Sequence, residues 1–343
     1  MKIEKKVEGK IRVIIMMVMM GCNSGGVKDP EKVFLSEMVN LGKGFLDVFV
    51  SFGDMITGTL GIKAETKKSE IGGYFSKIAE TMKEVREKLE KIVGEYGNYE
   101  KVKGKVEEFI GRIGKIEEGA KEAALGASGN DTIGNAVKDQ AAKAADITSV
   151  SKLVKGIKGI VGMVLGEKEG NADNNVITEE KKDIGKLFGK KDDDRTQEAE
   201  AAKANASIGT VSGADILKAM SQSNEDLKAD NTNGIEAAKD AAEIAIASAV
   251  DNKKEIKDPA KKDAVIAAGI ALRAMAKDGK FAAKQDASDK YANAVNGVVA
   301  NAVSKVLSTL TIAIRNRVDE GLKEINKVLG EIQQGEIFEA KSN

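Results

Sequence analysis

The sequence predicts an all-α protein built as an elongated multi-helix bundle. Apolar residues recur at every third or fourth position along most of the chain, which is the period of an amphipathic helix. Both prolines of the chain, Pro30 and Pro259, follow an aspartate and indicate helix starts. Sustained alternation and Asn-Gly hairpins between β-branched runs, the usual signs of a sheet, are missing. We therefore expect one helical domain over residues 30–335.

The chain begins with a segment typical of a bacterial lipoprotein export signal. Cations within residues 1–12 precede an unbroken apolar run at residues 13–20, and Gly21 and Cys22 follow. That run is far shorter than the ~20 residues of a membrane-spanning helix. We predict a signal peptide over residues 1–21, cleavage between Gly21 and Cys22, and lipidation of Cys22. The alternative is a buried free cysteine behind a leader of another kind.

The lipid on Cys22 would be the membrane contact of the mature protein, with residues 22–29 as a tether. One acyl chain gives only marginal membrane binding, at ~0.8 kcal/mol per buried CH₂, whereas two or three chains anchor firmly. The membrane, bound through the lipid on Cys22, is therefore the first partner that the sequence predicts.

Composition excludes several functional classes. The 54 cations and 54 anions give a net charge of zero, so the chain lacks the basic footprint of a nucleic-acid-binding protein. Histidine is absent and Cys22 is the single cysteine, which removes the usual general base, nucleophilic dyads and histidine metal sites. We expect no catalytic residue, no cofactor and no metal site, and hence a protein that is not an enzyme.

The first mature helix is expected over residues 30–62. Its apolar content is high, but charges at Glu37, Lys43, Asp47 and Asp54 argue against a transmembrane helix and favour a buried central helix.

The next two helices should form an antiparallel hairpin. Each has one apolar face; the first consists of Tyr74, Ile78, Met82, Val85, Leu89 and Ile92, and the second of Val102, Val106, Phe109, Ile113 and Ile116.

The middle of the chain combines one well-marked helix with polar loops. Residues 150–164 predict a helix in which Gly156, Gly159 and Gly162 form a ridge that lets a neighbouring helix approach closely. A phosphate loop would require a preceding strand, which the pattern does not indicate. Residues 167–200 are expected to be the least structured segment, and residues 221–233 a second polar stretch. Short alanine-rich helices are expected at residues 213–220 and 235–250.

Two helices close the domain. One should run over residues 258–277 from the Asp258-Pro259 start, and the other over residues 288–329, which is ~60 Å long. We expect the final helix to pair with the first, which would place both chain ends near the membrane and the loop-rich middle far from it. Residues 336–343 are expected to form a polar tail.

Two charged clusters are candidate sites. Asp192, Asp193 and Asp194 lack the spacing and closing glutamate of a calcium loop, so a solvated acidic corner is favoured. A lysine-rich stretch is either a solvated helix start or a site for a polyanion; it comprises Lys253, Lys254, Lys257, Lys261 and Lys262.

Several blocks of the chain resemble the variable large proteins of relapsing-fever Borrelia, a family of variable major outer-surface lipoproteins. The blocks cover nearly the whole mature chain and lie at residues 23–27, 41–50, 52–55, 114–123, 151–158, 211–217, 262–281 and 302–316. The resemblance implies a lipid-anchored helical antigen of the outer membrane, lipidated at Cys22. It further implies that switching among variants evades host antibody.

The resemblance implies that host antibodies are partners of the protein. Whether it forms a homo-oligomer and whether it binds a host ligand are left open by the sequence. An adhesin that binds a host component through its membrane-distal surface is the main alternative. A periplasmic lipoprotein enzyme is the third reading, which the lack of histidine disfavours.

Overall fold

The computed structural model describes residues 61–96, 100–174, 176 and 178–341. Helices dominate these residues, which confirms the all-α fold class. The expected first helix, its pairing with the last helix, Gly21 and Cys22 lie outside the described residues. These expectations, like the polar tail and the domain boundaries, stay predictions.

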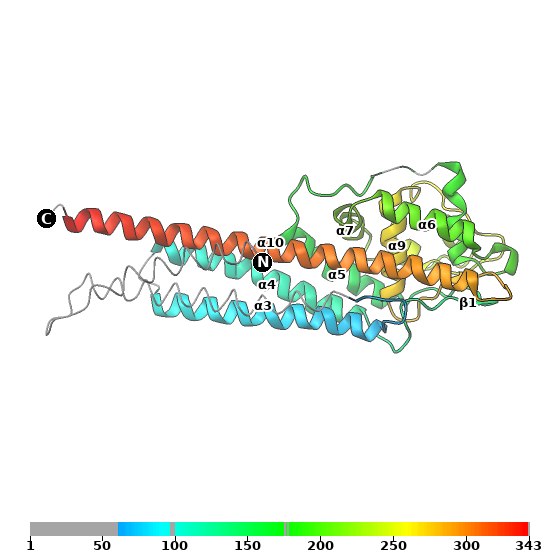
Figure 1. The fold of residues 1–343 in the computed structure, drawn as a ribbon, viewed down its shortest axis with the longest axis horizontal. Coiled ribbons are helices and arrows are strands. Elements are labelled where there is room, and N and C mark those ends of the chain that lie inside the picture. The colour runs from blue at the N-terminus through cyan, green and yellow to red at the C-terminus, as the bar shows by residue number, and fades with distance from the viewer. Residues whose placement is uncertain (1–60, 97–99, 175, 177, 342–343) are drawn as a thin grey trace.

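The first two described helices form the predicted antiparallel hairpin. α3 (Lys68–Tyr96) and α4 (Glu100–Gly126) lie side by side along one end of the molecule (Figure 1). Their apolar faces are buried as expected; the buried members are Ile78, Met82, Val85, Leu89 and Ile92 on α3, and Val106, Phe109, Ile113 and Ile116 on α4. Arg86 joins the two helices through its Nε, which lies 2.9 Å from Oε2 of the buried Glu117.

α5 (Ile147–Val164) packs closely against α4 because glycines meet at the contact. A Cβ placed on Gly156 would lie 2.4 Å from the Ala123 nitrogen and 2.5 Å from the Gly119 oxygen. The predicted ridge is therefore confirmed at Gly156. Gly162 faces open space, with no atom within 4 Å of a Cβ built there, so it takes no part in the contact.

α10 (Lys290–Lys341) has 52 residues and is about 78 Å long, longer than the sequence pattern predicted. It runs along the whole molecule in Figure 1. Its predicted stripe is buried at Val295, Val299, Val303, Val306, Leu310, Ile314, Val318, Leu322 and Ile325. The part Lys290–Ile325 is long and apolar enough to cross a membrane, but half of the best window is buried inside the protein. We therefore interpret α10 as the core helix of the bundle.

Figure 1 shows two parts with different architecture. The stem consists of α3, α4 and the C-terminal half of α10, and the head consists of the described residues between 127 and 289 with the N-terminal half of α10. The head is rich in loops, as expected, and lies at the end of α10 opposite to the C-terminus.

Short elements build the head around one buried helix. Every residue of α9 (Asp263–Met275) is buried, and α9 packs against α6 (Glu198–Thr210), α7 (Gly213–Ser221), α8 (Ala241–Ile246) and α10. The remaining elements are the 3₁₀ helices η2 (Glu179–Phe188), η3 (Asp192–Asp194) and η4 (Gly234–Ala237), and the parallel strand pair β1 (Val137–Lys138) and β2 (Ala282–Ala283).

Three expectations for the head were wrong. Residues 167–200 contain η2, which buries Ile184, Leu187 and Phe188 in the core instead of being the least structured segment. The expected helix over residues 235–250 is reduced to η4 and α8, and the helix expected from residue 258 begins at Asp263. In each case contacts with distant segments decide the local structure.

Candidate functional site

The lysine segment, defined as Lys253, Lys254, Lys257, Lys261 and Lys262, lies in the loop between α8 and α9. Each of its amines faces a carboxylate. The amine of Lys253 is 3.3 Å from Glu236, and that of Lys254 is 2.8 Å from Asp194. The other three lysines pair with Glu255, Glu179 and Asp173, respectively. The segment is therefore a charge-paired surface.

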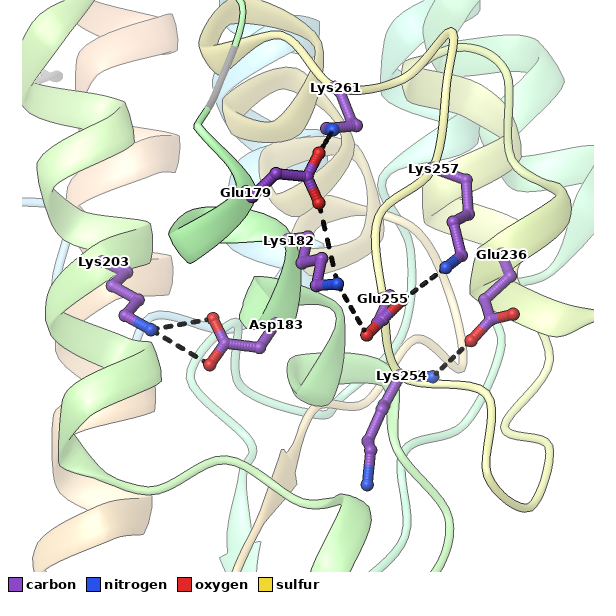
Figure 2. Close-up of polar contacts among 9 residues, drawn as sticks. All are labelled: Glu179, Lys182, Asp183, Lys203, Glu236, Lys254, Glu255, Lys257 and Lys261. Atoms are coloured by element: carbon purple, nitrogen blue, oxygen red, sulfur yellow. Dashed lines mark hydrogen bonds and ion pairs between the residues drawn. The ribbon is translucent and has the colours of Figure 1, made fainter.

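Part of this surface is a continuous chain of alternating charges (Figure 2). Lys261 pairs with Glu179, whose second oxygen lies 3.6 Å from the Lys182 amine. Lys182 lies 3.3 Å from Glu255, which also pairs with Lys257. Hydrogen bonds from the lysines hold the pKa of Glu179 and of Glu255 below the usual range. The same bonds raise the pKa of Lys257 and Lys261, so all these groups are charged near neutral pH.

Asp194 is the buried member of the acidic cluster, with only 2% of its surface exposed. Burial opposes its charge, but hydrogen bonds from the Lys254 amine and the Asn252 N–H, both 2.8 Å long, hold the pKa of Asp194 below its usual value. The expectation of a solvated acidic corner was therefore wrong for Asp194. In the part of the chain that the structure describes, no group of His, Cys, Asp or Glu has an arrangement that could hold a metal ion.

The lysine segment also differs from the expected solvated helix start. Because α9 begins only at Asp263, the segment precedes the helix as an irregular loop. Three of the five carboxylates beside it come from η2, η3 and η4, whereas Glu255 belongs to the same loop and Asp173 precedes η2. The pairing leaves these five amines without the excess positive charge that a polyanion site needs.

A surface hollow of about 580 Å³ lies beside residues 228–239. Its lining includes Asp230, Asn231, Thr232 and Lys239, and it contains no aromatic ring. Asp230 accepts hydrogen bonds from the N–H groups of Thr232 and Asn233, which hold its pKa low and shape the loop. Its carboxylate therefore stabilises the local backbone.

Two buried cations at the junction of stem and head were not singled out from the sequence. Lys68, the first residue of α3, and Arg273 on α9 are both fully buried. The Lys68 amine donates to the Ala276 and Gly279 oxygens at 2.6 and 2.7 Å. Burial lowers the pKa of both cations, that of Lys68 to about 7.

Arg273 is held by carbonyl groups and aromatic rings. Its guanidinium donates to the Lys280 oxygen at 3.0 Å and to the Ala247 oxygen at 3.0 Å. The same group lies 4.9 Å from the ring centre of Phe188 and 5.9 Å from that of Phe281. A single arginine in the otherwise apolar run after Asp263 was the available signal for this buried cation, whereas nothing local distinguishes Lys68.

This architecture is similar to that of a known surface antigen, and the sequence is similar to known Borrelia proteins. The crystal structure of the Lyme disease variable surface antigen VlsE of Borrelia burgdorferi matches with a TM-score of 0.76 and 35% identity, covering 88% of this chain and 100% of that one. Variable large protein 17 of Borrelia hermsii is 58% identical over 310 residues, which are 89% of this chain and 87% of that protein. Variable large protein 4 of the same species is 57% identical over 336 residues, 95% and 94% of the two chains.

The fold and these likenesses define the class as the helical variable surface antigens. A family model described as Borrelia lipoprotein matches residues 45–329, and the chain belongs to this family. The family resemblance inferred from the sequence is thereby confirmed.

Proposed function

We propose that this protein is a lipid-anchored surface antigen of the outer membrane whose replacement by other variants evades host antibody. Its relatives are variable antigens, and its family is one of lipoproteins. No catalytic step enters this function, which depends on what the outer surface presents.

The separation of a buried frame from exposed loops is the observation that carries the proposal. α9 and the stripe of α10 are buried, whereas most of residues 222–233 and 251–258 are exposed or half-buried. Substitutions at exposed positions away from special contacts change stability by no more than about 0.5 kcal/mol. One frame can therefore carry many different loop surfaces, as antigenic variation requires.

Loop replacement tests the antigen role directly. Residues 224–233 would be replaced by the corresponding loop of Variable large protein 17, with residues 73–84 of the stem replaced in a matched control at exposed positions only. We expect antibodies from infected hosts to lose most binding to the loop variant while helical circular dichroism and the melting temperature are retained. Unchanged antibody binding after replacement of every exposed head loop would contradict the proposal.

The anchor is tested separately at Cys22. Cells expressing the full chain would be labelled with palmitate, extracted, and compared with cells that express Cys22→Ala. We expect label in the wild type alone, and loss of the wild-type protein when intact cells are treated with protease. An unlabelled wild type that retains residues 1–21 would refute lipidation, and protection from protease would refute surface exposure.

Adhesion to a host polyanion is the alternative that the lysine segment suggested, and the ion pairs weigh against it. The wild type should pass through a heparin column at physiological salt because the lysines are paired. The combined variant Glu179→Gln, Glu236→Gln and Glu255→Gln should be retained, since it removes three of the partner charges. A matched triple change of Glu80, Glu84 and Glu118 to Gln on the stem controls for net charge. Strong retention of the wild type would favour the adhesin.

A further inference from the structure

The contact between Lys68 and the loop after α9 is the junction from which a further property follows. Lys68 begins the stem helix α3, and its amine reaches the oxygens of Ala276 and Gly279 in the head. The backbone of Lys68 contacts a second loop of the head, because its N–H donates to the Asp131 backbone oxygen at 2.9 Å. Lys68 therefore links the start of the stem to two loops of the head, to one through its side chain and to the other through its backbone.

The surroundings of this amine suit its neutral form. A neutral amine has two N–H groups, and two carbonyl oxygens accept from it; within the described residues no third acceptor lies in hydrogen-bond range. An ammonium would leave its third N–H buried without a partner, which is unfavourable.

No carboxylate contacts the amine to compensate a positive charge. The charged groups around it are Asp131, Asp278, Lys143 and Arg273. Asp278 is bound to Lys143 at 2.8 Å, and Asp131 is exposed to solvent. Arg273 adds a second positive charge, which disfavours protonation of Lys68 further.

We propose that Lys68 is a proton-sensitive latch that joins stem and head and opens when its amine gains a proton. In the closed state the buried amine is neutral over the alkaline range, whereas in an open state the hydrated amine is an ordinary lysine and takes up a proton. Lower pH therefore favours opening until the closed state is protonated too. Burial lowers the pKa of the closed latch to about 7 from 10.5, so the opening equilibrium rises about tenfold per unit of falling pH between these values and levels off below 7.

The other charged groups do not account for such a change. Carboxylates keep their charge between pH 7 and 9, and ordinary lysines stay protonated there. Burial lowers the pKa of Arg273 to about 9, so this group begins to lose its proton only near the upper end of the range. Burial raises the pKa of the nearby Tyr74 to about 12, which keeps its hydroxyl protonated in the same range. Between pH 7 and 8, Lys68 is therefore the group whose titration the experiment can isolate, and Lys68→Met separates its contribution from that of Arg273 at pH 9.

Hydrogen exchange on the full mature chain tests the latch at pH 7, 8 and 9. Protection factors, which remove the intrinsic pH dependence of exchange, would be compared for residues 66–72 and 276–283 and for α5 as an internal reference. We expect protection of the two junction segments to fall about tenfold from pH 9 to 8 and about fivefold from pH 8 to 7, with little change in α5. In Lys68→Met this pH dependence should vanish, while the control Lys77→Met, at an exposed position of α3, should behave as the wild type.

A direct titration keeps the proposal testable if Lys68→Met does not fold. Carbon-13 labelling of lysine side chains in the wild type should reveal one resonance, assigned to Lys68, with a midpoint near 7 instead of near 10.5. A midpoint near 10.5, or junction protection that does not depend on pH in the wild type, would overturn the latch. The same slope in Lys68→Met and the wild type would assign the effect to another group and overturn it as well.

Discussion

The contact between α4 and α5 and the lysine segment of the head are held together in opposite ways. At Gly156 the two helices approach so closely that a single added methyl group would overlap backbone atoms of α4. In the lysine segment, long flexible side chains form ion pairs at or near the surface. The first contact depends on shape at the level of one carbon atom, whereas the second depends on charge and tolerates movement.

This difference explains how one chain can combine a constant frame with a changeable surface. Truncating a buried large apolar side chain removes about 2–5 kcal/mol, whereas an exposed ion pair contributes about 0–1 kcal/mol. A domain of ordinary stability, about 5–15 kcal/mol, can lose many surface pairs but few core contacts. The comparison leads to four predictions, which test whether the frame and the charge-paired surface differ as strongly as their contacts indicate.

The largest effect on the free energy of unfolding is expected from truncating a residue in the buried stripe of α10. Leu310→Ala removes a fully buried side chain and should lower the free energy of unfolding by about 3 kcal/mol, through lost burial and the cavity that remains. Ile312→Ala is the matched control two residues away, because Ile312 is 58% exposed, and it should change stability by less than about 0.5 kcal/mol. Chemical denaturation of both variants is the measurement. Equal losses would mean that α10 is not the core helix.

The glycine contact should give the next largest effect. Gly156→Ala places a methyl group 2.4 Å from the Ala123 nitrogen, so α5 has to move away and stability should fall by about 1–3 kcal/mol. Gly162→Ala lies in the same helix but faces open space, and it should raise stability by about 0.5–1 kcal/mol because alanine favours the helix. Melting curves that shift in the same direction for both variants would contradict the close approach of the two helices.

The long helices of the described chain could be predicted from the sequence because their signal is local. The faces of α3, α4, α5 and α10 repeat every three or four residues, and nearly all of the face residues whose burial the structure describes are buried. Gly156 was part of a predicted ridge, but the sequence could not distinguish it from Gly162, since the distinction depends on where α4 lies.

The rest of the head could not be predicted because its contacts join distant segments. Asp194 is buried against Lys254, 60 residues away, and Lys68 reaches Ala276 across 208 residues. η2 forms in a segment with a polar composition because Phe188 packs against Phe281 and Arg273. The charge pairing of the lysine segment likewise needs three separate elements, so the sequence alone left both a solvated helix start and a polyanion site open.

Substitution of Asp194 should have an intermediate effect on the free energy of unfolding, because its side chain is both buried and charged. Asp194→Asn removes the charged partner of Lys254 and should lower stability by about 1–3 kcal/mol at pH 7. The pKa of Asp194 is lowered in the folded state, so its contribution is present above the unfolded value of about 3.8 and is lost as pH falls through the folded value.

The difference between wild type and Asp194→Asn should therefore shrink below about pH 4. Asp193→Asn is the neighbouring control, because the Asp193 side chain is 93% exposed and its loss should be barely measurable. Urea denaturation from pH 3 to 7 would reveal the trend. If the stability difference between wild type and Asp194→Asn stays constant down to pH 3, the contact with Lys254 does not stabilise the ionised form of Asp194.

The smallest effect is expected at the solvent-facing end of the charge-paired surface. Lys257→Gln removes the partner of Glu255, but Glu255 keeps its contact with Lys182 at 3.3 Å. Because exposed pairs are weak and screened by salt, the melting temperature should shift by no more than about 1 °C, and the shift should disappear near 1 M salt. Changing Lys182 together with Lys257 to Gln leaves Glu255 without either cation and should give a larger shift that salt also reduces. A loss from Lys257→Gln as large as that from Leu310→Ala would remove the contrast between frame and surface, because this part of the head could then not vary freely.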